Sequence, residues 1–387
     1  MEELEGTVGG LEKKVGKMHY LVTGHTGFKG AWLCLMLLEQ GHKVSGISLE
    51  PYELPALEGV AEERQITKGV YELAQVGQRI EESGGQDVIL DIRDHTALEA
   101  KFAELQPDVV MHLAAQALVL EGYRDPRTTI ESNVMGTFNV MQASEKAGSV
   151  KAQLIITTDK VYKNVDKREG YREDEELGMN PDPYSSSKAA ADIIAQVMIV
   201  HPDSKVPTAI SRGGNVIGGG DVCQDRLFVD LLRDAAAGRE TVIRYPESTR
   251  PWQHVLDCDA TYISIVQALL DGVPNVAGEA FNAAPKKTDF IEVSTIADLV
   301  VDCWNNTEPK LGVEAQGWKT VDKEFWHEAH LLALDPSKVE QVLGWKGILD
   351  WKEATQWSVN WTKRVLAGQD AGDVCMDEIR EYNRLKG

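Results

Sequence analysis

The sequence predicts an α/β protein built on a doubly wound parallel sheet, with a smaller and discontinuous domain formed by the C-terminal part of the chain. Two observations predict this fold class. Short apolar segments alternate with helical segments over about the first 210 residues, and the first apolar segment runs into a glycine-rich turn. Strand–helix alternation of this kind is typical of Rossmann-like folds.

The elements follow one another from the first strand onward. That strand begins at "MHYLVTG". Further strands are predicted at 43–49, 87–92, 108–115, 152–158 and 208–214, and helices at 29–40, 95–105, 130–147 and 184–200. After residue 214 the pattern changes to a glycine-rich loop and a Trp-rich tail. We therefore expect a dinucleotide-binding domain at 1–214, with returns near 250–285, and a substrate-binding domain at 215–387.

The composition and net charge limit which molecules the protein is expected to bind. The 387 residues carry 40 Lys+Arg against 61 Asp+Glu, a net charge of −21, so the surface repels nucleic acid and anionic membranes. An anionic ligand then needs a local basic pocket. The five cysteines are scattered without a CxxC pair, and neither a signal core nor an apolar run of transmembrane length is present. We expect a cytoplasmic protein without nucleic-acid or membrane partners.

The glycine-rich turn "TGHTGFKG" places Gly24, Gly27 and Gly30 between a strand and an apolar helix. Such glycines let backbone N–H groups and the helix N-terminus reach a pyrophosphate, whereas the alternative is a plain tight turn. The predicted dinucleotide-binding residues are Gly24, Thr26, Gly27, Phe28, Lys29, Gly30, Ser48, Asp91, Ile92, Leu113, Ala114, Ala115, Gln116, Asn133, Thr157, Tyr184, Lys188 and Gly213.

The choice between NAD and NADP stays open. The second strand ends at Ser48 without the acid that would bind a ribose 2′-hydroxyl, and Glu50 is close by. Ser48 together with Lys29 would tolerate a 2′-phosphate. Farther along, Asp91 is expected on the adenine amino group and Ile92 on the adenine face.

"DPYSSSK" places Tyr184 and Lys188 one helical turn apart on one helix face. A lysine ammonium and a cationic nicotinamide would both lower the pKa of the phenol, so Tyr184 could act as a base on a sugar hydroxyl. The strand at 152–158 ends in Thr158, Asp159 and Lys160. Because ligands of doubly wound sheets bind at the carboxyl ends of strands, Thr158 should face Tyr184. The plainer alternative is a capping Asp159 and a solvated Lys160.

A basic pocket is available in the second half. A diphosphate and its base could be held by Asn215, Arg226, Arg244 and Arg250, with Gln116 as a further substrate contact. The plainer interpretation of each arginine, taken singly, is a surface residue. No metal site is expected. "HEAH" at 327–330 lacks the HExxH spacing, and His25 and His112 are expected to bond locally.

Together these motifs resemble the extended short-chain dehydrogenase/reductase superfamily and, within it, the CDP-glucose 4,6-dehydratase family. The resemblance runs over about residues 16–361 through "VTGHTGFKGAWL", "HLAAQALV", "NVMGT", "TTDKVY", "DPYSSSK", "GNVIGGGD", "DRL", "RPWQHVL" and "LGW". It implies a tightly held nicotinamide cofactor that oxidises the sugar at C4, elimination of water across C5 and C6, and return of the hydride to C6. A 4-keto-6-deoxy sugar nucleotide results.

The same resemblance implies roles for single residues. Tyr184, helped by Thr158 and Lys188, would deprotonate the 4-hydroxyl, Asp159 would protonate the departing C6 hydroxyl, and a neutral Lys160, its pKa lowered by burial, would take the C5 proton. The chain departs from the family pattern near the expected substrate site, at Leu120, Gly122 and Val222.

Two other functions remain on the same scaffold. A C4-epimerase needs Thr158, Tyr184 and Lys188 but not the acid and base after Thr158, and a cofactor-sensing binding protein needs neither Tyr184 nor Lys188. The apolar faces of the helices at about 127–147 and 184–200 predict a homodimer through a four-helix bundle, unless both faces pack on the sheet.

Overall fold

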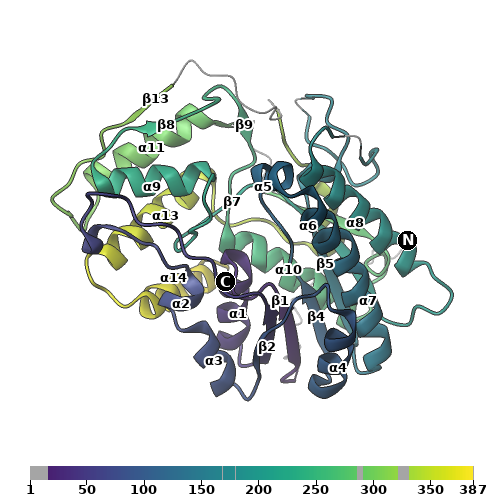
Figure 1. Ribbon diagram of the computed structural model, residues 1–387. Helices are drawn as coiled ribbons and strands as arrows, with labels where there is room; N and C mark the ends of the chain where they lie inside the picture. Colours follow the sequence, from purple (N-terminus) through teal and green to yellow (C-terminus); the bar gives the residue numbers. More distant parts are fainter. Residues whose placement is uncertain (1–15, 168, 179, 286–290, 321–330, 387) are drawn as a thin grey trace, which may run out of the picture.

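The centre of the molecule is a seven-stranded parallel sheet with the strand order β11-β6-β5-β4-β1-β2-β3, which confirms the predicted fold class (Figure 1). It is seen in a computed structural model that describes residues 16–167, 169–178, 180–285, 291–320 and 331–386. The strands are β1 (His19–Thr23), β2 (Lys43–Ser48), β3 (Asp87–Ile89), β4 (Val109–His112), β5 (Ala152–Thr158), β6 (Thr208–Gly213) and β11 (Ala280–Ala283).

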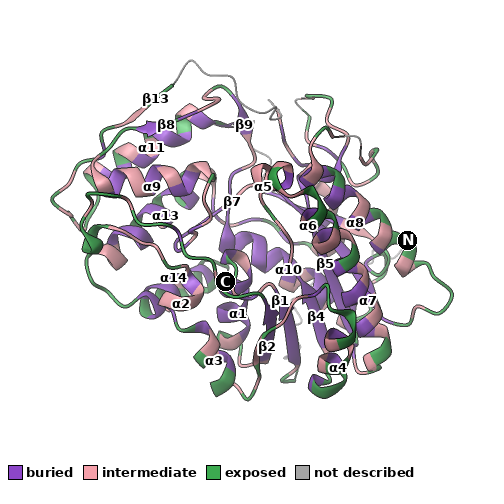
Figure 2. Ribbon diagram, in the orientation of Figure 1, coloured by how far each residue is buried: buried purple, intermediate pink, exposed green. Residues whose placement is uncertain are grey.

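Both faces of the sheet are covered. Along β1, Tyr20 and Val22 belong to one core cluster and Leu21, which points to the opposite face, belongs to another. A parallel sheet is expected to be buried in this way because its crossover helices lie on both faces. Figure 2 shows the buried strands between helices whose outer faces are exposed.

Helices on one face are α4 (His95–Leu105), α7 (Gly136–Ala147) and α8 (Pro183–Ile199), which lie side by side in Figure 1. On the other face, α1 (Phe28–Glu39) packs against α10 (Val255–Leu270) and against α14 (Ala371–Lys386). Segments that are distant in sequence therefore share this face, and the last helix contacts the first.

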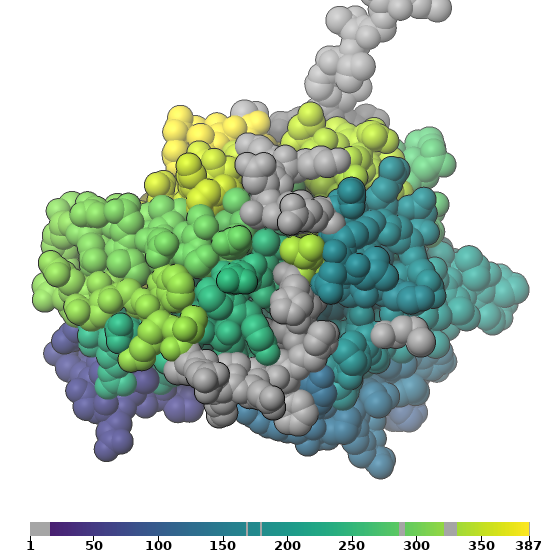
Figure 3. Space-filling model, turned by 90° about the horizontal axis from the view of Figure 1, so that it is seen from above, coloured from purple at the N-terminus to yellow at the C-terminus, as the bar shows by residue number. Residues whose placement is uncertain are grey.

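A second lobe surrounds its own core. Its helices α9 (Leu227–Ala237), α11 (Val293–Asn306) and α13 (Trp351–Leu366) enclose an apolar cluster that includes Leu231, Val300 and Val359. Its strands form two-stranded pairs: β7 (Val216–Ile217) with β10 (Gln253–His254), β9 (Thr249–Arg250) with β12 (Ile291–Glu292), and β8 (Thr241–Val242) with β13 (Trp318–Lys319). Seen from above, the green lobe and the blue-green helices of the first lobe flank the middle of the molecule (Figure 3).

The helix predicted at 130–147 is present, with one irregularity. α6 (Pro126–Ile130) continues through a π-helical turn, η2 (Glu131–Met135), into α7. Within that turn the Asn133 side chain reaches out to two other segments, and π turns are often found at functional sites. The other short helices are η1 (Glu62–Arg64), α2 (Val70–Leu73), α3 (Val76–Glu82), α5 (Val119–Arg124), η3 (Asp159–Val161) and α12 (Ser337–Leu343).

Candidate active site

A cavity of about 410 Å³ is lined by residues of both lobes. On the sheet side, its wall includes the end of β5, the first turns of α8, and Gly213 at the end of β6. On the other side, it includes the loop after β6, α9 and residues 242–245. The carboxyl ends of strands therefore open into it, as ligand sites of doubly wound sheets do.

The turn between β1 and α1 has the form of an anion cradle. Gly24 has φ +79°, and a Cβ there would lie 2.8 Å from the Ala114 backbone nitrogen. A Cβ on Gly30 would collide with the Gly24 carbonyl oxygen. The first turn of α1 carries no acidic residue, and Gly27 at its N-cap offers no side chain, so backbone N–H groups there stay available to a phosphate.

Ser48 and Lys29, which the sequence placed together, lie apart, and this part of the prediction is wrong. The Ser48 hydroxyl bonds Thr26 at 2.7 Å, on the β2 side of the cradle. Lys29 Nζ lies 3.2 Å from the Tyr262 hydroxyl on α10 and 4.0 Å from a methyl group built on Gly213 of β6. Because β6 and β2 are four strand spacings of about 4.8 Å apart, Lys29 is remote from Ser48.

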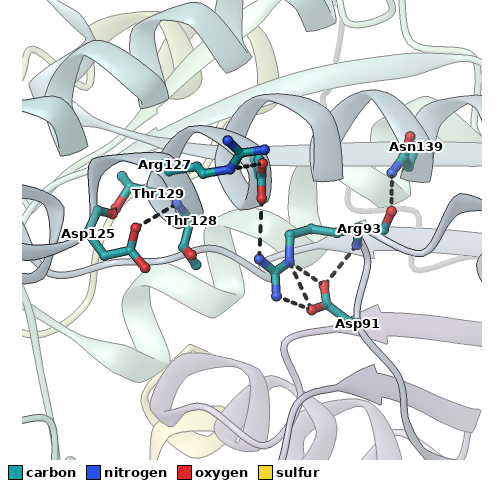
Figure 4. Close-up of polar contacts among 8 residues, drawn as sticks. Asp91, Arg93, Asp125, Arg127, Thr128, Thr129 and Asn139 are labelled. Atoms are coloured by element: carbon teal, nitrogen blue, oxygen red, sulfur yellow. Dashed lines mark hydrogen bonds and ion pairs between the residues drawn. The ribbon is translucent and has the colours of Figure 1, made fainter.

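Asp91, which was predicted to bind the adenine amino group, is paired with Arg93. Its carboxylate accepts hydrogen bonds from the Arg93 guanidinium at 2.6 and 2.9 Å and from the Arg93 backbone at 2.9 Å (Figure 4). These bonds from Arg93 lower the pKa of Asp91. Ile92 departs from the prediction, since its side chain is buried in the core beneath Gly136 of α7 and offers little face to an adenine ring.

Only some of the predicted cofactor residues in the segment after β4 line the cavity. Leu113 and Ala115 line the cavity. Gln116, expected as a cofactor and substrate contact, does not line it, because its amide bonds the Leu118 backbone and the Thr129 hydroxyl. Asn133 is buried, accepts from the Gln116 backbone at 2.8 Å and donates to Ser187 at 2.9 Å, so it ties this segment to α8.

Two further predicted cofactor residues are committed to the protein interior. Phe28 belongs to the large core cluster below α1. The Thr157 hydroxyl donates to Asp192 at 2.9 Å, and Asp192 forms a fully buried ion pair with Arg212 at 2.8 Å. Sequence reasoning missed this pair, although a charged Arg212 in a buried strand was a signal.

The proposed catalytic side chains meet at the cavity floor. Asp182 caps α8 and Pro183 opens it, which sets Tyr184 in the first turn and Lys188 one turn later. Thr158, at the end of β5, lies near enough to the Tyr184 phenol to lower its pKa, and both residues line the cavity. Lys188 Nζ donates to the Ile156 carbonyl at 2.9 Å.

Burial has a larger effect than neighbouring charges on the pKa values of the two titrating groups on α8, Tyr184 and Lys188. Burial raises the pKa of Tyr184 to about 12, against a lowering by Thr158 and a further raising by Asp159, so the expected low phenol pKa is not found in the protein by itself. Burial, followed by the positive charge of Lys29, lowers the pKa of Lys188, which is about 8.

Asp159 and Lys160 differ in exposure. The Asp159 side chain is 1% exposed, its Oδ1 accepts from Thr158 at 2.8 Å, and its Oδ2 has no hydrogen-bond partner among the described residues. Lys160 Nζ lies 3.7 Å from Asp159 Oδ1 with 29% of its side chain exposed, so the burial expected for Lys160 is only partial.

The predicted basic pocket is present on the cavity wall, which includes Asn215, Arg226, Arg244 and Arg250. Arg226 is held by Asp221 at 2.7 Å. Of the positions that depart from the family pattern, Leu120 lines the cavity and Gly122 lies against the Tyr184 backbone, where a Cβ would be 3.1 Å from its nitrogen. Val222 is packed in a separate small core.

Histidines near the site make local bonds, as predicted: His25 to Asp87 at 2.6 Å, and His112 to Thr23 at 2.7 Å. No cluster of metal ligands is found within the described part of the chain, and "HEAH" at 327–330 lies outside it. In the same described ranges no helix has the length and apolar character needed to cross a membrane.

Known proteins match nearly the whole chain. The family model described as GDP-mannose 4,6 dehydratase matches residues 21–356. A CDP-glucose 4,6-dehydratase from Salmonella typhimurium is 36% identical over 368 residues, covering 93% of this chain and 95% of the relative. A dTDP-glucose 4,6-dehydratase from Escherichia coli is 26% identical, covering 70% of this chain and 76% of the relative.

Solved structures share the fold. A UDP-glucose-4-epimerase from Stenotrophomonas maltophila with bound NAD and formylated UDP-arabinopyranose has a TM-score of 0.71 at 21% identity, over 91% of this chain and all of that one. A dTDP-glucose 4,6-dehydratase from Bacillus anthracis in complex with NAD has a TM-score of 0.70 at 19% identity, over 90% of this chain and 97% of that one.

Proposed function

Because the chain belongs to the family described as GDP-mannose 4,6 dehydratase, we propose that it is a nucleotide-sugar 4,6-dehydratase that converts CDP-glucose to CDP-4-keto-6-deoxyglucose. One observation carries the proposal: in a chain 36% identical to a CDP-glucose 4,6-dehydratase, Thr158, Asp159 and Tyr184 converge on one cavity. The enzyme is thus a lyase that removes water from a sugar.

A dinucleotide fits the residues present. The close approach at Gly24 and Gly30 leaves no room for side chains, and the uncapped N-terminus of α1 offers donors to a pyrophosphate. Neighbours solved with NAD support NAD as the cofactor. Bound there, NAD supplies reversible oxidation, taking the sugar's C4 hydrogen with its electron pair and giving it back at C6.

The oxidation needs a base at the sugar 4-hydroxyl. Tyr184 supplies it once its pKa of about 12 is lowered by cationic neighbours, and Lys188 one turn away carries such a charge below pH ~8. Thr158, which lines the same cavity and lowers the pKa of the phenol, is placed to bond the same sugar hydroxyl. The 4-ketone acidifies the C5 proton.

Elimination then requires an acid and a base. The amine of Lys160 takes the C5 proton, and Asp159 gives a proton to the departing C6 hydroxyl, which leaves as water. Two observations support these roles. Asp159 Oδ2 has no hydrogen-bond partner among the described residues, and the partly exposed Lys160 places its Nζ 3.7 Å from Asp159 Oδ1. An epimerase has no need of either group.

A homodimer through α8 is supported by its surface. Ile193, Val197 and Val200 are 46%, 54% and 78% exposed and recur at helical spacing on one face. Ile130 and Met135, at 50% and 49%, are exposed on the segment that packs beside α8. Exposed apolar stripes on adjacent helices favour pairing with a twofold mate.

Five free cysteines accord with a reducing cytoplasm.

The test is to incubate the purified protein and NAD with CDP-, UDP-, GDP- and dTDP-glucose and to assay each mixture for the ultraviolet signal of a keto sugar in base. A keto-sugar signal with CDP-glucose supports the proposal. A 4-epimer formed without that signal contradicts it.

A further inference from the structure

One carboxylate on the cavity wall lies near arginines but makes no hydrogen bond or ion pair with the described residues. Asp230 lies on α9, four residues after Arg226, and its side chain lines the cavity. None of the hydrogen bonds or ion pairs found among the described residues involves its carboxylate oxygens, although they are partly buried. An ionised carboxylate in such a place requires donors, and a ligand can supply them.

The other cavity aspartates are accounted for. Asp159 belongs to the reaction centre, Asp182 caps α8, Asp221 holds Arg226, Asp166 accepts from the Leu331 backbone, and Asp225 faces Arg124 at 3.9 Å. Asp230 alone among these cavity aspartates has neither a catalytic nor a structural task within the described residues. It is therefore the candidate for direct contact with substrate.

The surroundings of Asp230 suit a nucleobase rather than a phosphate. Cavity residues of the same helix and of the segment opposite it include Phe228, Leu232, Val242 and Ile243, which are apolar, and Arg244 adds a positive charge nearby. Such side chains fit the flat faces of a base. A phosphate beside a carboxylate would be repelled, and the arginine Arg226, one turn closer to Tyr184, is the better phosphate partner.

We propose that Asp230 selects the nucleotide by accepting a hydrogen bond from the exocyclic amino group of cytosine; this rests on the proposed function, whose substrate it makes specific. Cytosine presents an amino donor where uracil and thymine present a carbonyl acceptor. Two acceptors cannot bond each other, so uridine and thymidine nucleotides would leave the Asp230 carboxylate buried and unsatisfied. That asymmetry gives discrimination of the kind seen at sites built for one polar group.

The electrostatics agree with this assignment. Burial raises the pKa of Asp230 to about 6, and Asp234 and Asp225 raise it further, while Arg244 and Arg233 lower it. The group is therefore mainly ionised, and hence an acceptor only, at neutral pH.

The experiment measures the affinities of CDP and UDP by calorimetry for the protein and for Asp230→Asn, with Asp234→Asn as the matched control. Asp234 is one turn further along α9, lies near Thr241 and is not among the residues that line the cavity. We expect the parent protein and D234N to favour CDP over UDP. In D230N the CDP affinity should fall about 10- to 100-fold, as for loss of a hydrogen bond to a charged group. Its UDP affinity should not fall, because an amide can donate to the uracil carbonyl.

The outcomes separate the two proposals. Equal affinity of the parent for CDP and UDP, or an unchanged preference in D230N, overturns the role of Asp230. Equal weakening of both nucleotides in D230N also overturns it, because Asp230 would then hold the ribose that they share. Dehydration of CDP-glucose is assayed separately, and its absence would count against the proposed function while leaving the nucleotide preference to be read from binding.

Discussion

The Thr158 hydroxyl donates a hydrogen bond to Asp159 Oδ1 at 2.8 Å, and Thr158 also lowers the pKa of the nearby Tyr184 phenol. One side chain thereby joins the group proposed for oxidation to the group proposed for elimination. Because both partners are buried, solvent does not separate the two tasks.

Asp159→Asn should stop elimination without stopping oxidation. Losing a general acid lowers kcat by about 10²- to 10⁴-fold, and the absorbance of reduced nicotinamide should appear on addition of CDP-glucose and persist. Asp203→Asn, the same change at a surface aspartate, serves as the control. A normal kcat in D159N would remove Asp159 from the reaction.

Lys160→Met should abolish exchange of the C5 proton with solvent deuterium while NAD still binds. The methionine keeps the length of the side chain but has no basic nitrogen. Lys163→Met is the matched control, because Lys163 is exposed and pairs with Glu176 at 3.0 Å. Undiminished C5 exchange in K160M, followed by nuclear magnetic resonance, would show that another group is the base.

Lys29→Met should move the alkaline fall of kcat to higher pH. The charge of Lys29 lowers the pKa of Lys188, which is about 8, so removing that charge raises this pKa and keeps the Lys188 ammonium to higher pH. Lys29→Arg keeps the charge and should keep the parental profile. Identical alkaline limbs in K29M and the parent would disprove the coupling.

Asp192→Asn should cost about 3–5 kcal/mol of unfolding free energy, because it leaves Arg212 buried without its countercharge. Urea unfolding measures the loss. Asp377→Asn breaks an exposed pair with Arg364 and should cost less than about 1 kcal/mol. Equal losses in the two variants would mean that the buried pair is not a special source of stability.

If the proposed dimer forms through α8, Ile193→Asp combined with Val197→Asp should convert it to a monomer, since two charges would be buried in the proposed interface. Light scattering on the intact protein gives the mass. Leu385→Asp, at a similarly exposed apolar residue on α14, should leave the dimer intact. A monomeric parent protein would contradict the interface outright.

The sequence predicted the parts of this site that depend on local pattern. Apolar runs ending in Gly24 and Thr158 predicted where strands stop, and the spacing of Tyr184 and Lys188 predicted a shared helix face. The domain boundaries remain a prediction. Contacts that depend on tertiary packing were not predictable: Lys29 meets Tyr262 across 233 residues only because α10 packs against α1.

Burial explains most of the remaining differences. The charges near Tyr184 predicted a lowered pKa, but burial of the phenol, which local sequence does not reveal, raises it. Gln116 and Ile92 were predicted from their places near strand ends, yet the Gln116 amide bonds neighbouring protein groups and the Ile92 side chain is buried in the core. Asp230 carried a signal, a carboxylate among apolar residues just after "DRLFV", whose meaning depended on the cavity.

The most direct test of the central claim is the product formed from CDP-glucose and NAD in deuterated water, identified by mass and nuclear magnetic resonance. We predict loss of one water, a ketone at C4, a methyl carbon at C6 and one solvent deuterium at C5. A product of unchanged composition with inverted C4 would contradict dehydration and make the protein an epimerase.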